Sequence, residues 1–323
     1  MKNLFLSTVA VFALGACSGE TPAETQAPST TEAAPETSTP TDATPAPETA
    51  LQPEVMATDS GARLDSVLAS QPEAIKARYG ARNPKATLEF LKIEPGMTVV
   101  EVLPGNNGWY TGILMPYLGS DGTLVGVDYD PEMWAAFGGF VNEEFLEARR
   151  SWAQSWTKNA GETRGEDDAA VKAFAFGNMP AEMAGTADAV LMIRALHHLN
   201  RFEEKGGFLT SALEETSRVL KPGGFVGVVQ HRGPEGNEDS WATGDQGYVK
   251  QSAVITAFTA AGFELVDQSE INANPKDQPS NEDRVWRLPP TLGGSADNEE
   301  LKAQMTAIGE SDRMTLLFRK TAL

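Results

Sequence analysis

Residues 98–110 read Thr-Val-Val-Glu-Val-Leu-Pro-Gly-Asn-Asn-Gly-Trp-Tyr, a valine-rich run followed by a glycine-containing turn. Its valine-rich first part, 98–103, lies between Pro95-Gly96 and Pro104-Gly105. A short apolar run of β-branched residues between turn-forming pairs is typical of a buried strand. Apolar residues then recur with helical spacing over 109–118. We therefore expect a buried strand, a tight turn and a helix, in that order.

The same alternation of apolar runs and helical spacing continues along the chain. Further strands are predicted at 123–128, 171–176, 187–194, 225–231, 263–268 and 314–320. Further helices are predicted at 131–159, 202–220 and 249–261. Strands that alternate with helices indicate a parallel sheet with helices on both faces. The sequence thus predicts an α/β, doubly wound, mostly parallel sheet of seven strands.

The first 57 residues differ in composition from the rest. Residues 1–16 combine a lysine near the start with an apolar run from Leu4 to Leu14, which is typical of a signal peptide and too short to span a bilayer. Residues 17–57 are dominated by Pro, Thr, Ala, Ser and Glu. Such a segment buries too little apolar surface to order itself. We expect a disordered acidic tether at 17–57 and one folded domain at 58–323.

Cys17 is the only cysteine of the chain and follows Leu14-Gly15-Ala16. These residues resemble the lipobox of bacterial lipoproteins, and the resemblance implies that Cys17 is lipidated and begins the mature chain. The alternative is an ordinary secretory cleavage site with an incidental cysteine. Ser18 follows the cysteine, which in Gram-negative lipoproteins favours the outer membrane. We expect a lipoprotein of the bacterial envelope, on the periplasmic face of the outer membrane.

Charge and cysteine count argue against several function classes. The 45 acidic and 26 basic residues give a formal net charge of −19, whereas nucleic-acid binding needs a basic surface. The same charge argues against electrostatic docking on anionic lipid, so we expect membrane contact through the lipid anchor alone. A single cysteine excludes an intramolecular disulfide and a multi-cysteine zinc site. The oligomeric state stays open.

All three histidines fall where predicted strands end. His197 and His198 follow the strand at 187–194, and His231 ends the strand at 225–231. Doubly wound sheets bind ligands beyond the carboxyl ends of their strands. Histidine also changes charge near neutral pH. Two interpretations therefore stay open: at least one of these side chains takes part in chemistry, or all three are structural.

The order of short motifs resembles class I S-adenosylmethionine-dependent methyltransferases over residues 92–266. The motifs are Glu101 to Gly108, Gly126-Val-Asp128, Gly177-Asn178-Met-Pro180, Asp188 to Leu191 followed by Ala195-Leu-His197-His198, and Arg218 to Gly224. The resemblance implies a Rossmann-like methyltransferase fold with an antiparallel last strand, and S-adenosylmethionine as cofactor. The cofactor-binding residues that it implies are Glu101 for the methionine amino group, Gly105 and Gly108 for the turn, Asp128 for the ribose hydroxyls and Asn178 for the adenine edge.

A narrower resemblance covers nearly the whole folded part. Its segments are similar to a family of predicted extracytoplasmic methyltransferases: Pro95 to Glu101, Gly108-Trp-Tyr-Thr111, Glu270 to Asp277, Leu288-Pro-Pro290 and Ile308 to Thr315. The glycine turn departs from the common pattern, because Leu103 replaces its usual first glycine and Asn107 its third. Asparagine adopts left-handed backbone conformations readily, whereas a leucine side chain would narrow the approach to the methionine moiety.

Methyl transfer requires donor and acceptor to be aligned, and it needs a general base only when the acceptor arrives protonated. His231 and His197 are our candidates for that base. Arg194 and Arg232 are candidates for holding an anionic substrate, and ion pairing with local carboxylates is the alternative.

The segment 270–312, between the last two predicted strands, is long for a structureless connection. Its polar and aromatic residues, Asn272 and Asn274 among them, suggest a lid over the cofactor cleft that contacts substrate. A structural flap over the sheet is the alternative. Trp109 and Tyr110 begin the helix after the turn, and they either line the cleft or only pack beside it.

Three functions compete at this point. The first is a lipid-anchored methyltransferase acting on a small molecule or an envelope component. The second is a non-catalytic exported binding protein on a degenerate methyltransferase fold, which the altered turn and the export signal favour. The third is a metal-dependent hydrolase built on the three histidines and Asp130. It ranks last because adjacent histidines project differently, so we expect no metal. A nicotinamide dehydrogenase is disfavoured because its glycine pattern is absent after the first strand.

Overall fold

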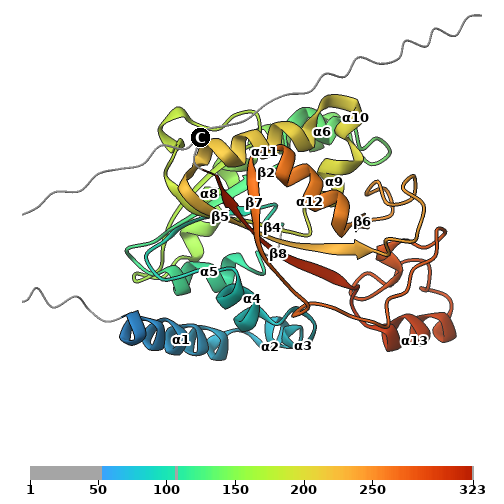
Figure 1. Cartoon of the computed structure of the whole chain (residues 1–323), viewed down its shortest axis with the longest axis horizontal. Helices are drawn as coiled ribbons and strands as arrows, with labels where there is room; N and C mark the ends of the chain where they lie inside the picture. The colour runs from blue at the N-terminus through green and yellow to red at the C-terminus, as the bar shows by residue number, and fades with distance from the viewer. Residues whose placement is uncertain (1–52, 106–107, 322–323) are drawn as a thin grey trace, which may run out of the picture. The chain divides into compact units, whose positions relative to one another are not determined.

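A central eight-stranded sheet organises the part of the chain that the structure describes. The computed structural model describes residues 53–105 and 108–321, and its strands are β1 (Thr98–Val102), β2 (Thr123–Asp128), β3 (Ala170–Ala175), β4 (Ala187–Ile193), β5 (Leu220–Gly233), β6 (Val249–Lys250), β7 (Phe263–Ser269) and β8 (Arg313–Lys320). The order is β3-β2-β1-β4-β5-β8-β7, and β6 pairs with β5. Neighbours from β3 to β5 are parallel, and β8 is antiparallel to β5 and β7 (Figure 1). The predicted α/β fold, parallel core and antiparallel last strand are confirmed.

The strand order contains one reversal, which locates the ligand-binding edge. The chain winds outward from β1 through β2 to β3 and then returns to β4 on the other side of β1. In open parallel sheets, the crevice for ligands forms at the carboxyl ends of the strands next to such a reversal. The carboxyl ends of β1, β2 and β4 are therefore the first place to look for a site.

Helices cover both faces of the sheet. One face packs against α1 (Pro53–Ser70), α4 (Pro84–Phe90), α5 (Thr111–Leu118) and α8 (Trp152–Thr163). The other face packs against α6 (Pro131–Ala135), α9 (Leu196–Arg201), α11 (Phe208–Val219) and α12 (Gln251–Ala260). Each face forms its own hydrophobic cluster, as expected when strands are apolar on both sides.

Alternation along the strands decides which face carries the acidic side chains. Val100 and Val102 of β1 belong to the cluster on the α6 and α11 face, whereas Val99 belongs to the cluster on the α5 face. Successive side chains of a strand point to opposite faces. Glu101 therefore lies on the α5 face. The same alternation in β2, where Leu124 is on the α5 face, puts Asp128 on that face too.

Two of the long predicted helices are wrong, because glycines interrupt them. The helix expected at 131–159 is three helices: α6, α7 (Glu143–Arg150) and α8. Gly138 and Gly139 separate the first two with φ of +66° and +57°, a left-handed conformation that ends a helix. The helix expected at 202–220 is likewise divided into α10 (Glu203–Gly206) and α11 by Gly207, at φ +65°.

The expected boundary between tether and domain is also wrong by a few residues. Helix α1 begins at Pro53, inside the predicted tether of 17–57, and its Leu64 is fully buried. The described residues, 53–105 and 108–321, belong to one compact unit. The predicted signal peptide at 1–16, the lipidation site Cys17 and the tether up to residue 52 lie outside the described residues, as does Asn107. Among the described residues, no helix is long and apolar enough to cross a membrane.

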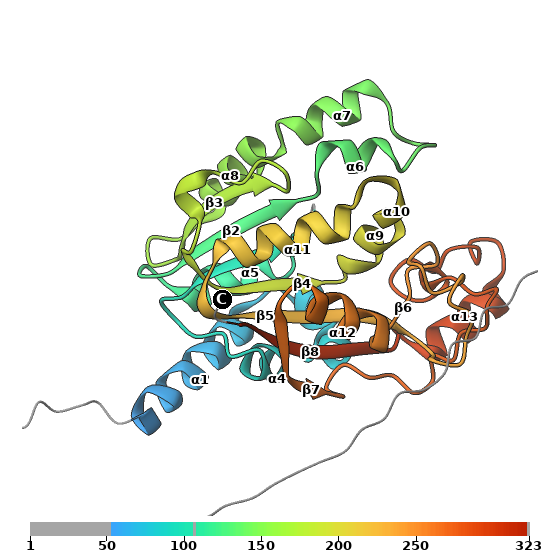
Figure 2. The ribbon, with the colours of Figure 1, turned by 45° about the horizontal axis from the view of Figure 1, so that its top comes forward.

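The segment between β7 and β8 is ordered around its own polar contacts. It contains the short helix η2 (Val285–Arg287) and α13 (Glu299–Ile308), and it lies beside the carboxyl end of β5 (Figure 2). Buried Asp277 accepts hydrogen bonds from the Tyr248 hydroxyl at 2.9 Å, the Arg287 guanidinium at 3.0 Å and the Asp312 backbone N–H at 3.0 Å. One carboxylate thus ties both ends of this segment to the loop before β6. The remaining short helices are α2 (Glu73–Lys76), α3 (Tyr79–Arg82) and η1 (Ala181–Met183).

Candidate active site

Glu101 lies near the carboxyl end of β1 with only 5 % of its surface exposed. The Thr111 hydroxyl, in the first turn of α5, donates a hydrogen bond to its Oε2 at 2.7 Å. Burial raises the pKa of Glu101 to about 7, and the Thr111 hydrogen bonds lower it in part. A buried carboxylate that is close to half ionised at neutral pH gains strongly from a cationic ligand, because the ligand offsets the cost of desolvation.

The glycine turn after β1 leaves room for a ligand backbone or sugar. Gly105 has φ +71°, and a Cβ built on it would meet no atom within 4 Å. Gly108 has φ +49° and approaches the Thr111 side chain. Leu103 itself adopts φ +54°, which is rare for a residue with a branched side chain. Its side chain packs against the cluster on the α6 face, so it points away from the face that carries Glu101.

Asp128 ends β2 and is 1 % exposed. Its Oδ1 accepts the backbone N–H of Tyr129 at 2.9 Å, and its Oδ2 accepts from the Arg149 guanidinium at 3.2 Å. Burial raises the pKa of Asp128, and Arg149 opposes that shift. Arg149 also lies over the rings of Trp134 and Phe145, at 4.7 and 4.8 Å. Arg149 from α7 thus occupies the position where hydroxyl groups of a ligand would meet Asp128.

Asn178 lies in the turn after β3 and is exposed. Its backbone N–H donates to the Ala175 carbonyl at 2.9 Å. The preceding Gly177, at φ +82°, lies so close to Asp130 that a Cβ would come within 2.7 Å of that carboxylate. The turn is therefore fixed next to the start of α6, and its amide side chain is open to solvent.

The three histidines meet at the edge of the sheet. The ring centroids of His197 and His198 are 4.0 Å apart, and those of His197 and His231 are 5.5 Å apart. Burial lowers the pKa of His197 to about 4, although its contact with the Gln230 side chain opposes the shift. Burial, and then the charge of His197, lower the pKa of His231 well below its usual value. These rings are therefore neutral at pH 7. Within the described ranges, no group of acidic, histidine or cysteine side chains has metal-binding geometry.

Trp109 and Tyr110 pack at the start of α5. Trp109 makes edge contacts with Tyr79 and Tyr110, and the Arg82 guanidinium lies 4.6 Å from its ring centroid. Tyr110 is 5 % exposed, and burial raises the pKa of its hydroxyl to about 12. Tyr110 is thus part of the packed wall, whereas Trp109 joins that wall to a cluster of arginines.

The two arginines proposed from the sequence have different environments. Arg232 is bound by Glu270 and Asp312, with nitrogen–oxygen distances of 2.6 to 3.1 Å, so its charge is used within the chain. The Arg194 side chain, after β4, makes no hydrogen bond or ion pair with any residue of 53–105 and 108–321 and borders a cavity of about 110 Å³. Ion pairing, the alternative considered above, thus describes Arg232 and not Arg194.

Asn272 and Asn274 hold the 270–312 segment on the domain. The Asn272 amide donates to the hydroxyls of Thr87 and Thr315 at 2.9 and 3.0 Å. The Asn274 amide donates to two backbone carbonyls, at residues 308 and 310. Both residues also line a cavity of about 260 Å³. Their amide nitrogens are therefore engaged in the chain itself, and their contact with substrate stays a prediction.

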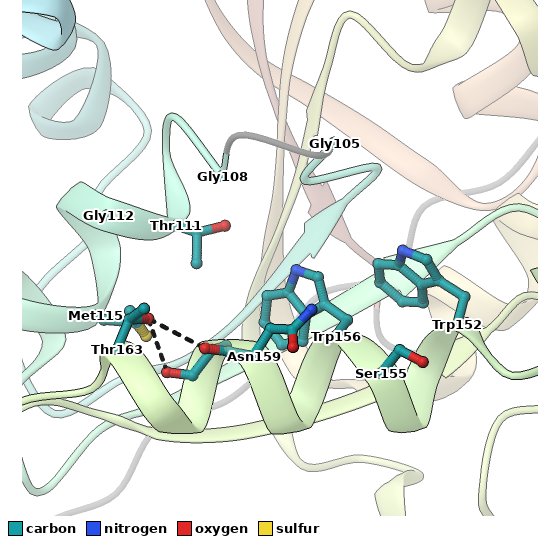
Figure 3. A pocket seen from close by; sticks show the side chains of 11 residues that line it. Gly105, Gly108, Thr111, Gly112, Met115, Trp152, Ser155, Trp156, Asn159 and Thr163 are labelled. Carbon is teal, nitrogen blue, oxygen red and sulfur yellow. Dashed lines mark hydrogen bonds between the residues drawn. The ribbon is translucent and has the colours of Figure 1, made fainter. Parts of the chain in front are cut away.

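A cavity of about 550 Å³ lies between α5 and α8, on the face that carries Glu101 (Figure 3). In the close view, Thr111 of α5 faces the indole rings of Trp152 and Trp156 of α8, and the glycine turn lies above them. The volume is in the range of small-molecule and cofactor sites. The cavity has apolar and aromatic walls, as expected for a site that binds a flat or extended ligand.

Several residues of the site were missed by the sequence prediction. Arg149, Arg82, Arg313 and Glu310 each contribute a charge to this edge of the sheet. Arg149 follows Asp128 by 21 residues across an interrupted helix, and no local pattern signals that pair. Arg313 lies opposite His231 only because β8 inserts between β5 and β7. The position of Arg313 beside His231 follows from the order of strands in the sheet, which sequence periodicity does not predict.

Comparisons with known proteins identify the domain. Residues 101–228 match the family model for a methyltransferase domain. No curated protein matches the chain. Similar solved structures include the [4+2]-cyclase SpnF, with 17 % identity over 75 % of this chain and 81 % of that one and a TM-score of 0.43. Another is a SAM-dependent methyltransferase from Aquifex aeolicus, with 18 % identity over 62 % of this chain and 93 % of that one and a TM-score of 0.41. A third is geranyl diphosphate methyltransferase in complex with GPP and sinefungin, with 15 % identity over 74 % of this chain and 77 % of that one and a TM-score of 0.46.

The match at 101–228 covers the segment from Glu101 to the middle of β5. This match to a methyltransferase domain supports the predicted class I methyltransferase and S-adenosylmethionine as its cofactor. The domain therefore confirms the predicted enzyme class and cofactor, and the individual binding residues stay predictions.

The side chains at the edge fit this cofactor. Glu101 and Asp128 are buried carboxylates on one face of adjacent strands, and the space beside Gly105 is open. A carboxylate suits an ammonium group, and a second one suits a pair of ribose hydroxyls. An ionised carboxylate accepts up to about four hydrogen bonds, so Asp128 could bind the hydroxyls with its remaining lone pairs or in exchange for Arg149. Arg149 is on the short helix α7, which has no buried residue, so such an exchange leaves the core intact.

Proposed function

We propose that this protein transfers a methyl group from S-adenosylmethionine to a small-molecule or envelope acceptor, outside the cytoplasm, while it is anchored to the membrane through Cys17. The cofactor supplies an electrophilic methyl group on a sulfonium. The protein then has to bind both partners, align them and exclude water. The observation that carries this proposal is the pair of buried carboxylates, Glu101 and Asp128, on one face of the matched methyltransferase domain.

The side chains divide into groups by role. Glu101 binds the amino group of the cofactor and Asp128 binds its ribose, while Gly105 and Gly108 allow close approach. Asn178 is open to an adenine edge. His231 is neutral because burial lowers its pKa, so it can accept a proton from an acceptor that arrives protonated. His197 supports the His231 ring by contact and is itself fully buried, which makes His231 the better candidate for the base.

Calorimetric titration of the full-length protein with S-adenosylmethionine and S-adenosylhomocysteine tests the cofactor. We expect micromolar binding. Asp128→Asn should weaken it by about tenfold or more, because the side chain that binds the ribose hydroxyls loses its charge. Asp121→Asn is the matched control, since Asp121 is exposed just before the opposite end of the same strand. No binding by folded protein at millimolar ligand would refute cofactor use.

The anchor needs its own experiment. In a cell that lipidates proteins, the full-length chain should partition into the detergent phase of a cloud-point extraction, and Cys17→Ser should move it to the aqueous phase. Mass spectrometry of the mature N-terminus should show acyl chains on Cys17. A mature chain that begins at another residue, with no lipid, would contradict the anchor and leave the methyltransferase proposal intact.

The second candidate is an exported binding protein without turnover. The contact between Arg149 and Asp128 favours it, because the ribose-binding carboxylate is already partnered. A binding protein would bind a ligand in the cavity between α5 and α8 and show no affinity for S-adenosylhomocysteine. The titration above separates the two candidates.

A further inference from the structure

Arginine side chains gather on one side of the site and exceed their acidic partners. Arg78, Arg82 and Arg313 all contact Glu310, and Arg194 lies close enough to influence Arg82. Arg82 and Arg313 are only 4 % and 2 % exposed. Three guanidinium groups thus share one carboxylate, and the guanidinium of Arg194 lies near them without an acidic partner of its own in the described part of the chain. A buried excess of positive charge is costly, and here it occurs in a chain with a net charge of −19.

The electrostatic strain of this cluster is visible in the individual groups. Burial, and then the charge of Arg194, lower the pKa of Arg82 to about 9. Burial and the charge of Arg313 lower the pKa of Arg194. The buried Nε of Arg82 has no hydrogen-bond partner among the described residues. An added anion beside Arg194 would relieve this repulsion.

A cavity is present where such an anion would bind. Its polar lining residues are Arg194, His231, Ser311 and Glu310, whose carboxylate is paired with the other arginines, and Trp286, Pro289 and Pro290 of the 270–312 segment form its apolar wall. Its volume of about 110 Å³ is several times what one water molecule needs. Polar groups at one end and flat apolar groups at the other suit a small molecule with an anionic head and an apolar body.

The cavity is on the side of the site where an acceptor would have to bind. The strand order places Asp128, Glu101, Arg194, His231 and Arg313 on the consecutive strands β2, β1, β4, β5 and β8, or directly after them. Neighbouring strands lie about 4.8 Å apart, and the cavity residues Arg194 and His231 are one and two strands from Glu101. Along this edge of the sheet, the residue proposed for the cofactor ribose comes first, the residue for its amino group second and the arginines third. His231 lies beside the cavity.

We propose that Arg194, with Arg82 and Arg313 behind it, binds the oxyanion of a small methyl acceptor, a carboxylate or a phosphate, and that Trp286 and Pro289-Pro290 cover its apolar part. This inference rests on the proposed function, because it names the acceptor class for the same site. It also gives the 270–312 segment a role, in that the segment forms one wall of the acceptor cavity.

Calorimetric titration of the full-length protein with benzoate and phenyl phosphate tests the charge, and benzamide is the neutral control of nearly the same shape. We expect the two anions to bind about tenfold or more tightly than benzamide, because only they engage guanidinium groups. Arg194→Gln should remove that preference, and Arg194→Lys should restore part of it. Arg319→Gln is the control, since Arg319 is exposed and pairs with Glu264 at the far end of β8. The anion that binds more tightly, benzoate or phenyl phosphate, indicates whether the acceptor carries a carboxylate or a phosphate.

Folding of the variant is checked by its melting temperature. Arg194→Gln should melt at the same temperature as the wild type or higher, because it removes a repelling charge, and benzoate should no longer raise its melting temperature. Equal binding of benzoate and benzamide, or unchanged benzoate binding in Arg194→Gln, would overturn the inference.

A titration in saturating S-adenosylhomocysteine distinguishes the acceptor from the cofactor. Benzoate should bind equally well or better with that ligand present. Competition between them would overturn the inference, because the arginines would then bind the carboxylate of the cofactor. If S-adenosylhomocysteine binds and neither anion does, the acceptor class is wrong and the proposed function stands. If the anions bind and S-adenosylhomocysteine does not, the proposed function is wrong, and with it the assignment of the anion as an acceptor.

Discussion

Glu101 shows how a single residue combines a cost to folding with a use in binding. Its carboxylate is buried beside Thr111, and burial holds its pKa at about 7. In the unfolded chain the same group ionises near pH 4.5. Between these two values, the folded protein holds a proton that the unfolded chain has lost, so the folded state is favoured less as the pH rises.

The first prediction follows from that difference. The free energy of unfolding should fall by up to about 3 kcal/mol as the pH rises from 4.5 to 7, through Glu101 alone. Glu101→Gln should remove this part of the pH dependence, and the wild type and variant should be compared by urea unfolding at several pH values. Parallel stability curves for the two proteins would show that Glu101 ionises normally.

Cofactor affinity should respond to pH in the opposite direction. An ammonium group binds the ionised form of Glu101, so the affinity for S-adenosylhomocysteine should rise between about pH 5.5 and 7 and then level off. The affinity of Glu101→Gln should be weaker and independent of pH over that range. Calorimetric titration measures both, and an affinity that falls across the range in the wild type would place the ammonium group elsewhere.

Helix α7 provides a matched pair of residues at the scale of an element. Arg149 contacts buried Asp128, whereas its neighbour Arg150 pairs with Glu143 and Glu147 at the surface. Arg149→Met should lower the free energy of unfolding by about 1–3 kcal/mol, because a buried carboxylate loses its partner, and Arg150→Met by less than about 1 kcal/mol.

The same pair of variants tests whether α7 competes with the cofactor. S-adenosylhomocysteine should bind Arg149→Met at least as tightly as the wild type, since no ion pair has to be broken first, and Arg150→Met should match the wild type. Weaker binding to Arg149→Met would instead make Arg149 a direct contact of the ligand. Chemical denaturation and calorimetric titration on the same samples give both readings.

The 270–312 segment depends on Asp277 more than on its own helix. Asp277 is 2 % exposed and accepts hydrogen bonds from Tyr248, Arg287 and the backbone of Asp312. Asp277→Ala should cost about 3–5 kcal/mol and increase hydrogen exchange over 272–312 while the sheet stays protected. Asp297→Ala, an exposed change in the same segment, should alter neither. Uniform loss of protection across the domain would show that the segment does not open on its own.

At the scale of the whole molecule, the structure moves the start of the folded domain to Pro53. A chain that begins at residue 52 should melt within about 1 °C of one that begins at residue 18, because residues 18–51 lack the apolar surface to add to the core. A chain that begins at residue 71 should lose several kcal/mol, since it lacks Leu64, Val67 and Leu68 of the core. Circular dichroism on the three chains tests this, and an early melting transition for the first truncation would extend the domain toward the N-terminus.

Local sequence predicted the strands well and the charges of the site only in part. The strand at 98–102 is valine-rich and the strand that ends at Asp128 is mostly apolar, so the burial of both follows from composition. The two helix breaks were missed because a glycine ends a helix only when its φ is positive, as at Gly138 and Gly207. The arginine cluster was missed because Arg82 and Arg313 are 231 residues apart and meet through the sheet order alone.

The packing of Trp109 against Arg82 has an optical consequence. The emission wavelength of an indole depends on the charges around its ring, and a guanidinium lies 4.6 Å from this one. An anion that neutralises the neighbouring arginines should therefore shift the fluorescence of Trp109. Trp109→Phe should remove this part of the change, while Trp286 in the cavity wall and the other four tryptophans continue to emit. The protein carries its own spectroscopic reporter, which allows candidate acceptors to be screened without a label and without any methyl transfer.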